Sequence, residues 1–172
     1  MRRFTTQRGF TLIELLIVMV LLGITAAIAV PNFGRMIDSN QRASTANDIS
    51  GLLNFARAEA IRRANGVVVY ARDTGDASRG YEVCVRASLA ACKAGAANAE
   101  QLLRTTNDLP GSVTLSQTTP ATAADLVFNG RGMANQQFVY RLCGRSGTPA
   151  VDVEVNLGGQ IRINDNTNAT CP

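Results

Sequence analysis

The hydrophobic residues of the chain follow three different patterns. Residues 10–30 form an almost unbroken apolar run in which Glu14 is the only charged residue. From Asn32 to Asn65, apolar residues recur at helical spacing between polar ones, which predicts an amphipathic helix. Beyond Gly66 the period changes to two, which predicts β-strands. The chain therefore combines one long helical region with one region of strands.

Seven segments carry the strand pattern, and clusters of Gly, Asn, Asp, Ser and Pro separate them without an intervening helical pattern. They are residues 67–72, 81–87, 112–117, 125–129, 137–143, 151–156 and 161–164. Gly158-Gly159 between the last two predicts a tight hairpin. Asn65-Gly66 is expected to end the helix, with Gly66 in the left-handed conformation. The expected fold class is α+β, in which a long N-terminal stem helix packs on an antiparallel β-rich head.

The apolar run is long enough to cross a membrane. Its 21 residues would span roughly 31 Å as a helix, which is about the hydrocarbon thickness of a bilayer. Arg2, Arg3 and Arg8 precede it, and this charge asymmetry favours a cytoplasmic N-terminus. One interpretation is a signal peptide cut after Ala27-Ile28-Ala29, and the other is a retained anchor. The run exceeds the usual apolar core of a signal peptide, so we expect an anchor.

Composition argues against most enzyme classes. The chain has no histidine, which removes a Ser-His-Asp triad, a Cys-His dyad, a His-bearing zinc site and a His general base. It has 17 Lys and Arg against 13 Asp and Glu, but without the three N-terminal arginines the ratio is 14 to 13. We therefore predict that the protein is not an enzyme and needs no metal or cofactor. Any nucleic-acid contact must depend on local arginines.

The N-terminal residues "RGFTLIELLIVMVLLGITAAIAVPNF" resemble the signal of type IV pilins and pseudopilins. The resemblance implies that a prepilin peptidase cuts after Gly9 and that Phe10 becomes N-methylated. It also implies that Glu14 neutralises the N-terminal amine of a neighbouring subunit. A carboxylate in an apolar helix costs about 2.5 to 3.5 kcal/mol unless it is compensated, although a position near the interface would also let it reach water. The expected divisions are a leader (1–9), a transmembrane helix (10–30), an amphipathic stem (31–65) and the head (66–172).

Two further segments resemble the minor pilin and pseudopilin group called GspH/FimT. They are "LLNFARAEAIRRANGVVV" (residues 52–69) and "LVFNGRGMA" (residues 126–134). The resemblance implies a minor pilin that acts as a priming or tip subunit of a type IV pilus, or a minor pseudopilin of a type II secretion system. The implied partners are other pilins or pseudopilins, the prepilin peptidase and methylase, and the inner membrane, with the head in the periplasm. We expect Arg57 and Glu59 to lie on an exposed helix face and to form salt bridges at most, with a subunit contact as the alternative.

The four cysteines fit a location outside the cytoplasm, where two disulfides would form. Four cysteines allow three pairings, and the sequence-local one joins Cys84 to Cys92 and Cys143 to Cys171. Minor pilins that resemble this chain often carry a similar C-terminal bridge, which favours the pilus over the secretion system. A metal site is a poor alternative because no CxxC spacing occurs.

DNA binding for natural transformation is the competing function. Some FimT-like pilins bind DNA through a Gly-Arg-x-Arg motif, but here the corresponding residues are Gly159-Gln160-Ile161-Arg162, without the first arginine. Four arginines remain candidates for phosphate contacts: Arg131, Arg141, Arg145 and Arg162. Acidic residues share this region, so we expect solvated arginines.

Overall fold

The structure of the chain is a computed structural model that describes residues 10–171, except 74–76, 99, 123 and 145–148. The chain divides into two compact units, residues 1–37 and residues 38–172. The second unit, called the head unit below, contains every strand and most of the buried residues.

Helix α1 (Leu12–Arg63) is a single helix of 52 residues that begins in the first unit and ends in the head unit. It ends earlier than the sequence indicated, because Ala64 adopts the left-handed conformation, with φ of 47°. The expectation that Gly66 takes this role is therefore wrong. The Gly66 backbone N–H instead donates a hydrogen bond to the Asn65 side-chain oxygen.

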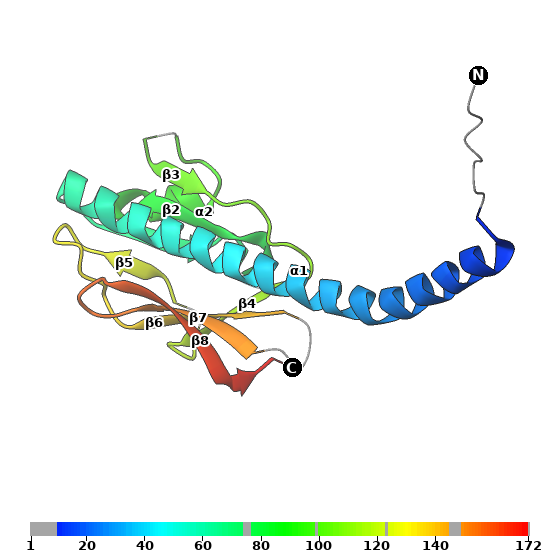
Figure 1. The fold of residues 1–172 in the computed structure, drawn as a ribbon. Helices are drawn as coiled ribbons and strands as arrows, with labels where there is room; N and C mark the ends of the chain where they lie inside the picture. Colours follow the sequence, from blue (N-terminus) through cyan, green and yellow to red (C-terminus); the bar gives the residue numbers. More distant parts are fainter. Residues whose placement is uncertain (1–9, 74–76, 99, 123, 145–148, 172) are drawn as a thin grey trace, which may run out of the picture. The chain divides into compact units, whose positions relative to one another are not determined.

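Two four-stranded antiparallel sheets make up the rest of the head unit (Figure 1). The first has the order β3-β2-β1-β5, and its strands are β1 (Val67–Ala71), β2 (Tyr81–Val85), β3 (Leu102–Thr105) and β5 (Leu126–Phe128). The second has the order β4-β6-β7-β8, and its strands are β4 (Thr114–Thr119), β6 (Phe138–Cys143), β7 (Pro149–Val155) and β8 (Ile161–Thr170). Three short helices lie between strands: η1 (Ala77–Arg79), η2 (Arg86–Ser88) and α2 (Leu89–Lys93).

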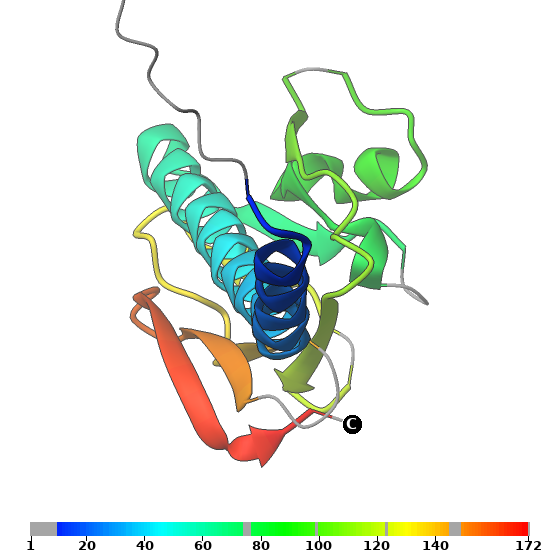
Figure 2. The same cartoon turned by 45° about the vertical axis from the view of Figure 1, so that its right-hand side comes forward.

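One core joins α1 to the inner faces of both sheets (Figure 2). On α1 the buried residues recur three or four positions apart, so they form one stripe: Ala46, Ile49, Leu52, Leu53, Ala56 and Ala60. The strands supply alternate residues, such as Phe138, Tyr140 and Leu142 of β6. The Tyr81 ring meets the Tyr140 ring edge to face at 5.5 Å, which links the two sheets.

The first sheet is also covered on its outer face. There α2 packs on β1 and β2, and a disulfide between Cys84 and Cys92 ties it to β2. Residues 67–70 of β1 are therefore all buried, because Val67 and Val69 face the main core while Val68 and Tyr70 face α2. A strand with two buried faces loses the alternation of polar and apolar residues, which accounts for the run "VVVY".

The α+β class and its antiparallel head are confirmed, with three differences in detail. Strand β3 and helix α2 lie in a stretch for which the sequence indicated no element. Strand β8 continues to Thr170, six residues beyond its expected end. Pairing with β7 explains this extension, because Asn166 still lies in register with Ala150.

Candidate assembly and binding sites

The N-terminal part of α1 exposes its apolar side chains. From Phe10 to Val30 the large apolar residues are between 48% and 82% exposed. This part of α1 is long and apolar enough to cross a membrane, judged by length and composition. A continuous apolar surface of this size needs lipid or other apolar helices around it.

Glu14 lies in the first turn of this helix. The Glu14 backbone N–H donates a hydrogen bond to the Thr11 hydroxyl at 3.3 Å, so Thr11 caps the helix. Thr11 and Glu14 have the T-x-x-E spacing of a capping box, and an acidic side chain at a helix N-terminus is favoured by the helix dipole. This capping role was missed in the sequence, although the spacing signals it. Phe10 precedes the helix, and Gly9 lies outside the described residues.

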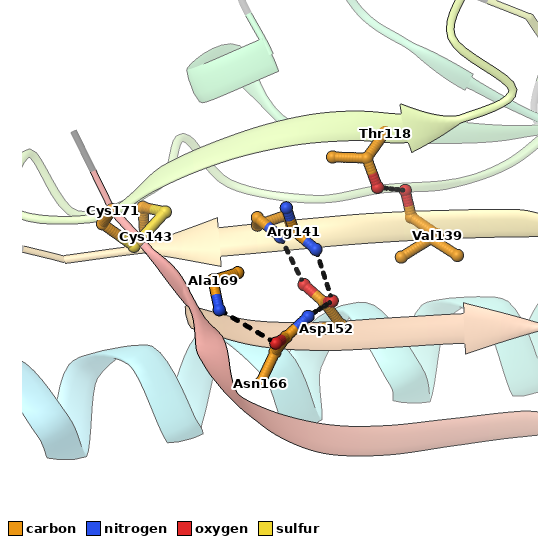
Figure 3. Close-up of polar contacts among 8 residues, drawn as sticks. All are labelled: Thr118, Val139, Arg141, Cys143, Asp152, Asn166, Ala169 and Cys171. Atoms are coloured by element: carbon orange, nitrogen blue, oxygen red, sulfur yellow. Dashed lines mark hydrogen bonds and ion pairs between the residues drawn. A yellow bond between two sulfur atoms is a disulfide. The ribbon is translucent and has the colours of Figure 1, made fainter. Parts of the chain in front are cut away.

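The second sheet carries a polar network on its outer face (Figure 3). Arg141 on β6 donates two hydrogen bonds to Asp152 on β7, at 2.9 and 2.8 Å. The Asn166 side chain on β8 donates to the same carboxylate at 2.7 Å and accepts from the Ala169 backbone N–H at 3.1 Å. Three strands are thereby joined through one nearly buried carboxylate.

The charge of Asp152 is stabilised despite its burial. Burial raises the pKa of this carboxyl, but the hydrogen bonds from Arg141 and Asn166 outweigh that effect. The pKa of Asp152 therefore lies below its ordinary value, and the same bond raises the pKa of Arg141. This geometry gives Arg141 an intramolecular carboxylate partner instead of leaving it free for phosphate.

A disulfide between Cys143 on β6 and Cys171 lies beside this network (Figure 3). With the disulfide between Cys84 and Cys92, it leaves no free cysteine among the residues that the structure describes. The two bridges join the sequence-local pairs. The second one attaches the end of the chain to a central strand of its sheet, where both cysteines pack with Ala150.

The remaining arginine candidates lie apart from that network. Arg131 is exposed in the turn after β5, and Arg162 is exposed on β8 opposite Glu154. Within the described part of the chain neither one forms an ion pair. Arg145 lies outside the described residues. DNA binding through these arginines stays a prediction.

Arg57 has a role that the sequence did not indicate. Its Nε donates to the Gly132 carbonyl at 3.0 Å, and its Nη2 donates to the Gly158 carbonyl at 3.3 Å. The side chain therefore ties α1 to the turn after β5 and to the β7–β8 hairpin. Hydrogen bonds from a charged donor contribute about 1.5 to 3 kcal/mol, so Arg57 fixes both turns. Neither expected role, an exposed helix face or a subunit contact, includes this link.

Glu59 forms salt bridges along α1, as the expectation for this helix face allowed. It accepts hydrogen bonds from Arg62 and Arg63 at 2.7 to 3.0 Å. The bonds from Arg62 and Arg63 lower the pKa of Glu59 to about 2. These contacts connect residues about one helical turn apart, and both carboxylate oxygens of Glu59 take part in them.

A groove of about 440 Å³ runs between residues 41–52 of α1 and residues 104–110. Its lining mixes polar and apolar residues and includes Asp48 and Arg104 together with the buried Ile49 and Leu52. Among the described residues, no group of three His, Cys, Asp or Glu is placed to hold a metal ion.

Two parts of the sequence match known families. Residues 5–30 match the prokaryotic N-terminal methylation motif. Residues 45–159, which are 115 of the 172 residues, match the family described as type II transport protein GspH. The chain belongs to the GspH family. This membership confirms the resemblance drawn from residues 52–69 and 126–134. No curated protein matches this GspH-family chain in sequence.

Solved structures share the fold of this GspH-family chain. The type IV minor pilin FimU of Pseudomonas aeruginosa aligns with a TM-score of 0.61 at 18% identity, over 79% of this chain and 96% of that one. A second crystal form of FimU gives a TM-score of 0.57 at 18% identity, over 75% and 96%. The minor pseudopilin EpsH of the Vibrio cholerae type 2 secretion system gives 0.52 at 13% identity, over 73% and 97%. At such identities the likeness is one of fold.

Proposed function

We propose that the protein is a minor pilin, a structural subunit that primes or caps a type IV pilus. The observation that carries this proposal is the N-terminal methylation motif, which leads into an exposed apolar helix in a chain of the GspH family. The fold likeness to FimU and the C-terminal disulfide favour the pilus.

The proposed sequence of events starts at the membrane. The chain inserts with its N-terminus in the cytoplasm and its head in the periplasm, anchored in the inner membrane by residues 10–30. The prepilin peptidase removes residues 1–9 by cutting after Gly9, and the Phe10 amine is methylated. Extraction into the filament exchanges lipid for other apolar helices, so little apolar burial is lost. The Glu14 carboxylate then pairs with the amine of a neighbouring subunit.

A minor pseudopilin of a type II secretion system is the second candidate. The description of the GspH family and the fold likeness to EpsH favour it. Both candidates need the same processing and the same anchor, so they differ only in the filament that takes up the subunit. Recovery of the chain from sheared pili would favour the pilus. A defect in protein secretion by cells that lack the chain would favour the secretion system.

Three variants test the assembly role of Glu14 against its capping role. Glu14→Gln keeps a capping side chain but removes the charge, while Thr11→Ala removes the cap and keeps the charge. Glu14→Leu removes both the carboxylate and its capping capacity. We expect all three to insert into the membrane, and we expect only Thr11→Ala to enter the filament normally.

The measurement is the amount of each variant in sheared filaments relative to the amount in membranes, by immunoblot. Normal incorporation of Glu14→Gln would show that the charge pair is not needed. Failure of Thr11→Ala with success of Glu14→Gln would assign the role of this turn to helix capping.

A further inference from the structure

Three exposed apolar residues lie on neighbouring segments at the C-terminal end of α1. Within the described part of the head unit, four large apolar side chains are exposed: Ile61 (50%), Met133 (43%), Leu157 (63%) and Ile163 (40%). The first three come from different segments, namely α1, the turn after β5 and the β7–β8 hairpin. Figure 1 shows these segments at the same end of the head unit. We call Ile61, Met133 and Leu157 the Ile61 patch.

Backbone contacts bring the three segments of the Ile61 patch together. A Cβ atom on Gly132 would lie 2.6 Å from the Ile61 Cδ1 atom, so Ile61 packs directly on the turn that carries Met133. The Ala134 N–H donates to the Leu157 carbonyl at 3.1 Å, and Gly159 lies against the Gly132 carbonyl. Because Arg57 also holds both turns, the patch is pre-organised, which lowers the entropy cost of binding.

The surroundings of the patch are positively charged. Residues 57–63, 129–134 and 154–162 contain five arginines and two glutamates, a difference of +3. One glutamate, Glu59, is already paired with Arg62 and Arg63. The unpaired cations of these segments are therefore available to a partner with carboxylates.

We propose that the Ile61 patch docks the head of a different filament subunit, whose contact surface has an apolar centre and an acidic rim. This proposal rests on the proposed function. An apolar centre with a polar rim is the ordinary anatomy of a protein interface. A second copy of this chain would place the same positive rim against itself, and like charges oppose that pairing. DNA would engage arginines only and would leave three exposed apolar side chains unexplained.

The test places a photo-reactive benzoylphenylalanine at Leu157 of the full chain in the cells that make the filament. On illumination we expect a cross-linked product with another protein that carries an N-terminal methylation motif, with acidic residues at the attachment site. A second probe at Met133 should give the same product. The same probe at Ser116, which is exposed on β4, is the control and should not give it.

Charge reversal at the rim gives a second, independent readout. Arg131→Glu should lower the yield of the Leu157 cross-link about fivefold, because it opposes an acidic partner. Arg79→Glu, a reversal at an exposed arginine of η1, is the matched control and should leave the yield unchanged.

The outcomes separate this inference from the proposed function. Cross-links from both probes to a second copy of the chain or to DNA would overturn the inference. Absence of any product while the chain enters filaments normally would overturn it too, and would leave the proposed function intact. Absence of the wild-type chain from every filament would remove the proposed function and this inference together.

Discussion

Gly159 lies where two turns come closest. Its φ is 73°, and a Cβ at this position would collide with the Gly132 carbonyl. Gly159→Ala should therefore destabilise the protein by more than about 1 kcal/mol, since left-handed geometry and the clash add. Gly158→Ala is the matched control, because its nearest neighbour is a side-chain atom at 3.3 Å. Thermal unfolding in detergent checks both, and equal losses would contradict the close approach.

Asp152 makes the stability of the second sheet depend on pH. Its pKa is lower in the folded chain than in the unfolded chain, so it adds stability that is fully present above about pH 4. This contribution is lost as pH falls below about 4 toward the folded pKa. Asp152→Asn should cost about 1 to 3 kcal/mol at neutral pH, because it breaks the ion pair with Arg141.

The measurement is the free energy of unfolding at several pH values between 7 and 2 for both proteins. Glu59 titrates in the same acidic range, so the informative quantity is the difference between the two curves. That difference should shrink as the pH falls below about 4. A constant difference would show that the carboxylate does not carry the effect.

At the scale of elements, the end of β8 depends on a covalent link. The bridge from Cys143 to Cys171 spans 28 residues, which corresponds to about 3.5 kcal/mol in a chain-entropy treatment. The bridge from Cys84 to Cys92 spans 8 residues, which corresponds to about 2.5 kcal/mol. Replacing the first pair by Ser should lower stability more and should expose β8 amides to hydrogen exchange. Replacing the second pair should affect amides of α2 instead.

Elements with a clear period were predictable from the sequence, and elements that depend on tertiary contacts were not. The alternation in "FVYRLC" and "VDVEVN" places Tyr140 inward and Asp152 outward, as the structure has them. Helix α2 has only five residues, too few to form a stable helix alone, and the Cys92 bridge holds it in place. The polar residues after Asn164 lack strand propensity and become a strand by pairing with β7.

The candidate sites also divide into features that a local sequence pattern signals and features that depend on tertiary contacts. The structure has the sequence-local cysteine pairing, which was one of the three that the sequence allowed. The cap at Glu14 is signalled by the local T-x-x-E spacing. The link from Arg57 to two carbonyls joins residues that are 75 and 101 positions apart, so no local pattern signals it. The partner of Arg141 was likewise hidden until the register of β6 and β7 placed Asp152 opposite it.

At the scale of the whole molecule, processing is the decisive prediction. The mature protein should begin at Phe10 with an N-methyl group, because residues 5–30 match the methylation motif. Mass spectrometry of the protein purified from its native membrane should find a chain that lacks residues 1–9 of the printed sequence. Its mass should exceed that of the unmethylated chain 10–172 by the mass that one N-methylation adds. A protein that begins at Val30 would instead be an exported free domain.

The buried stripe of α1 also determines how the subunit would withstand tension. It extends from Ala46 to Ala60 and packs on both sheets at once. A pull along the helix axis would load all of these contacts in parallel, as in shear, instead of peeling strands away one after another. This geometry would make the head unit resist a force that acts along α1.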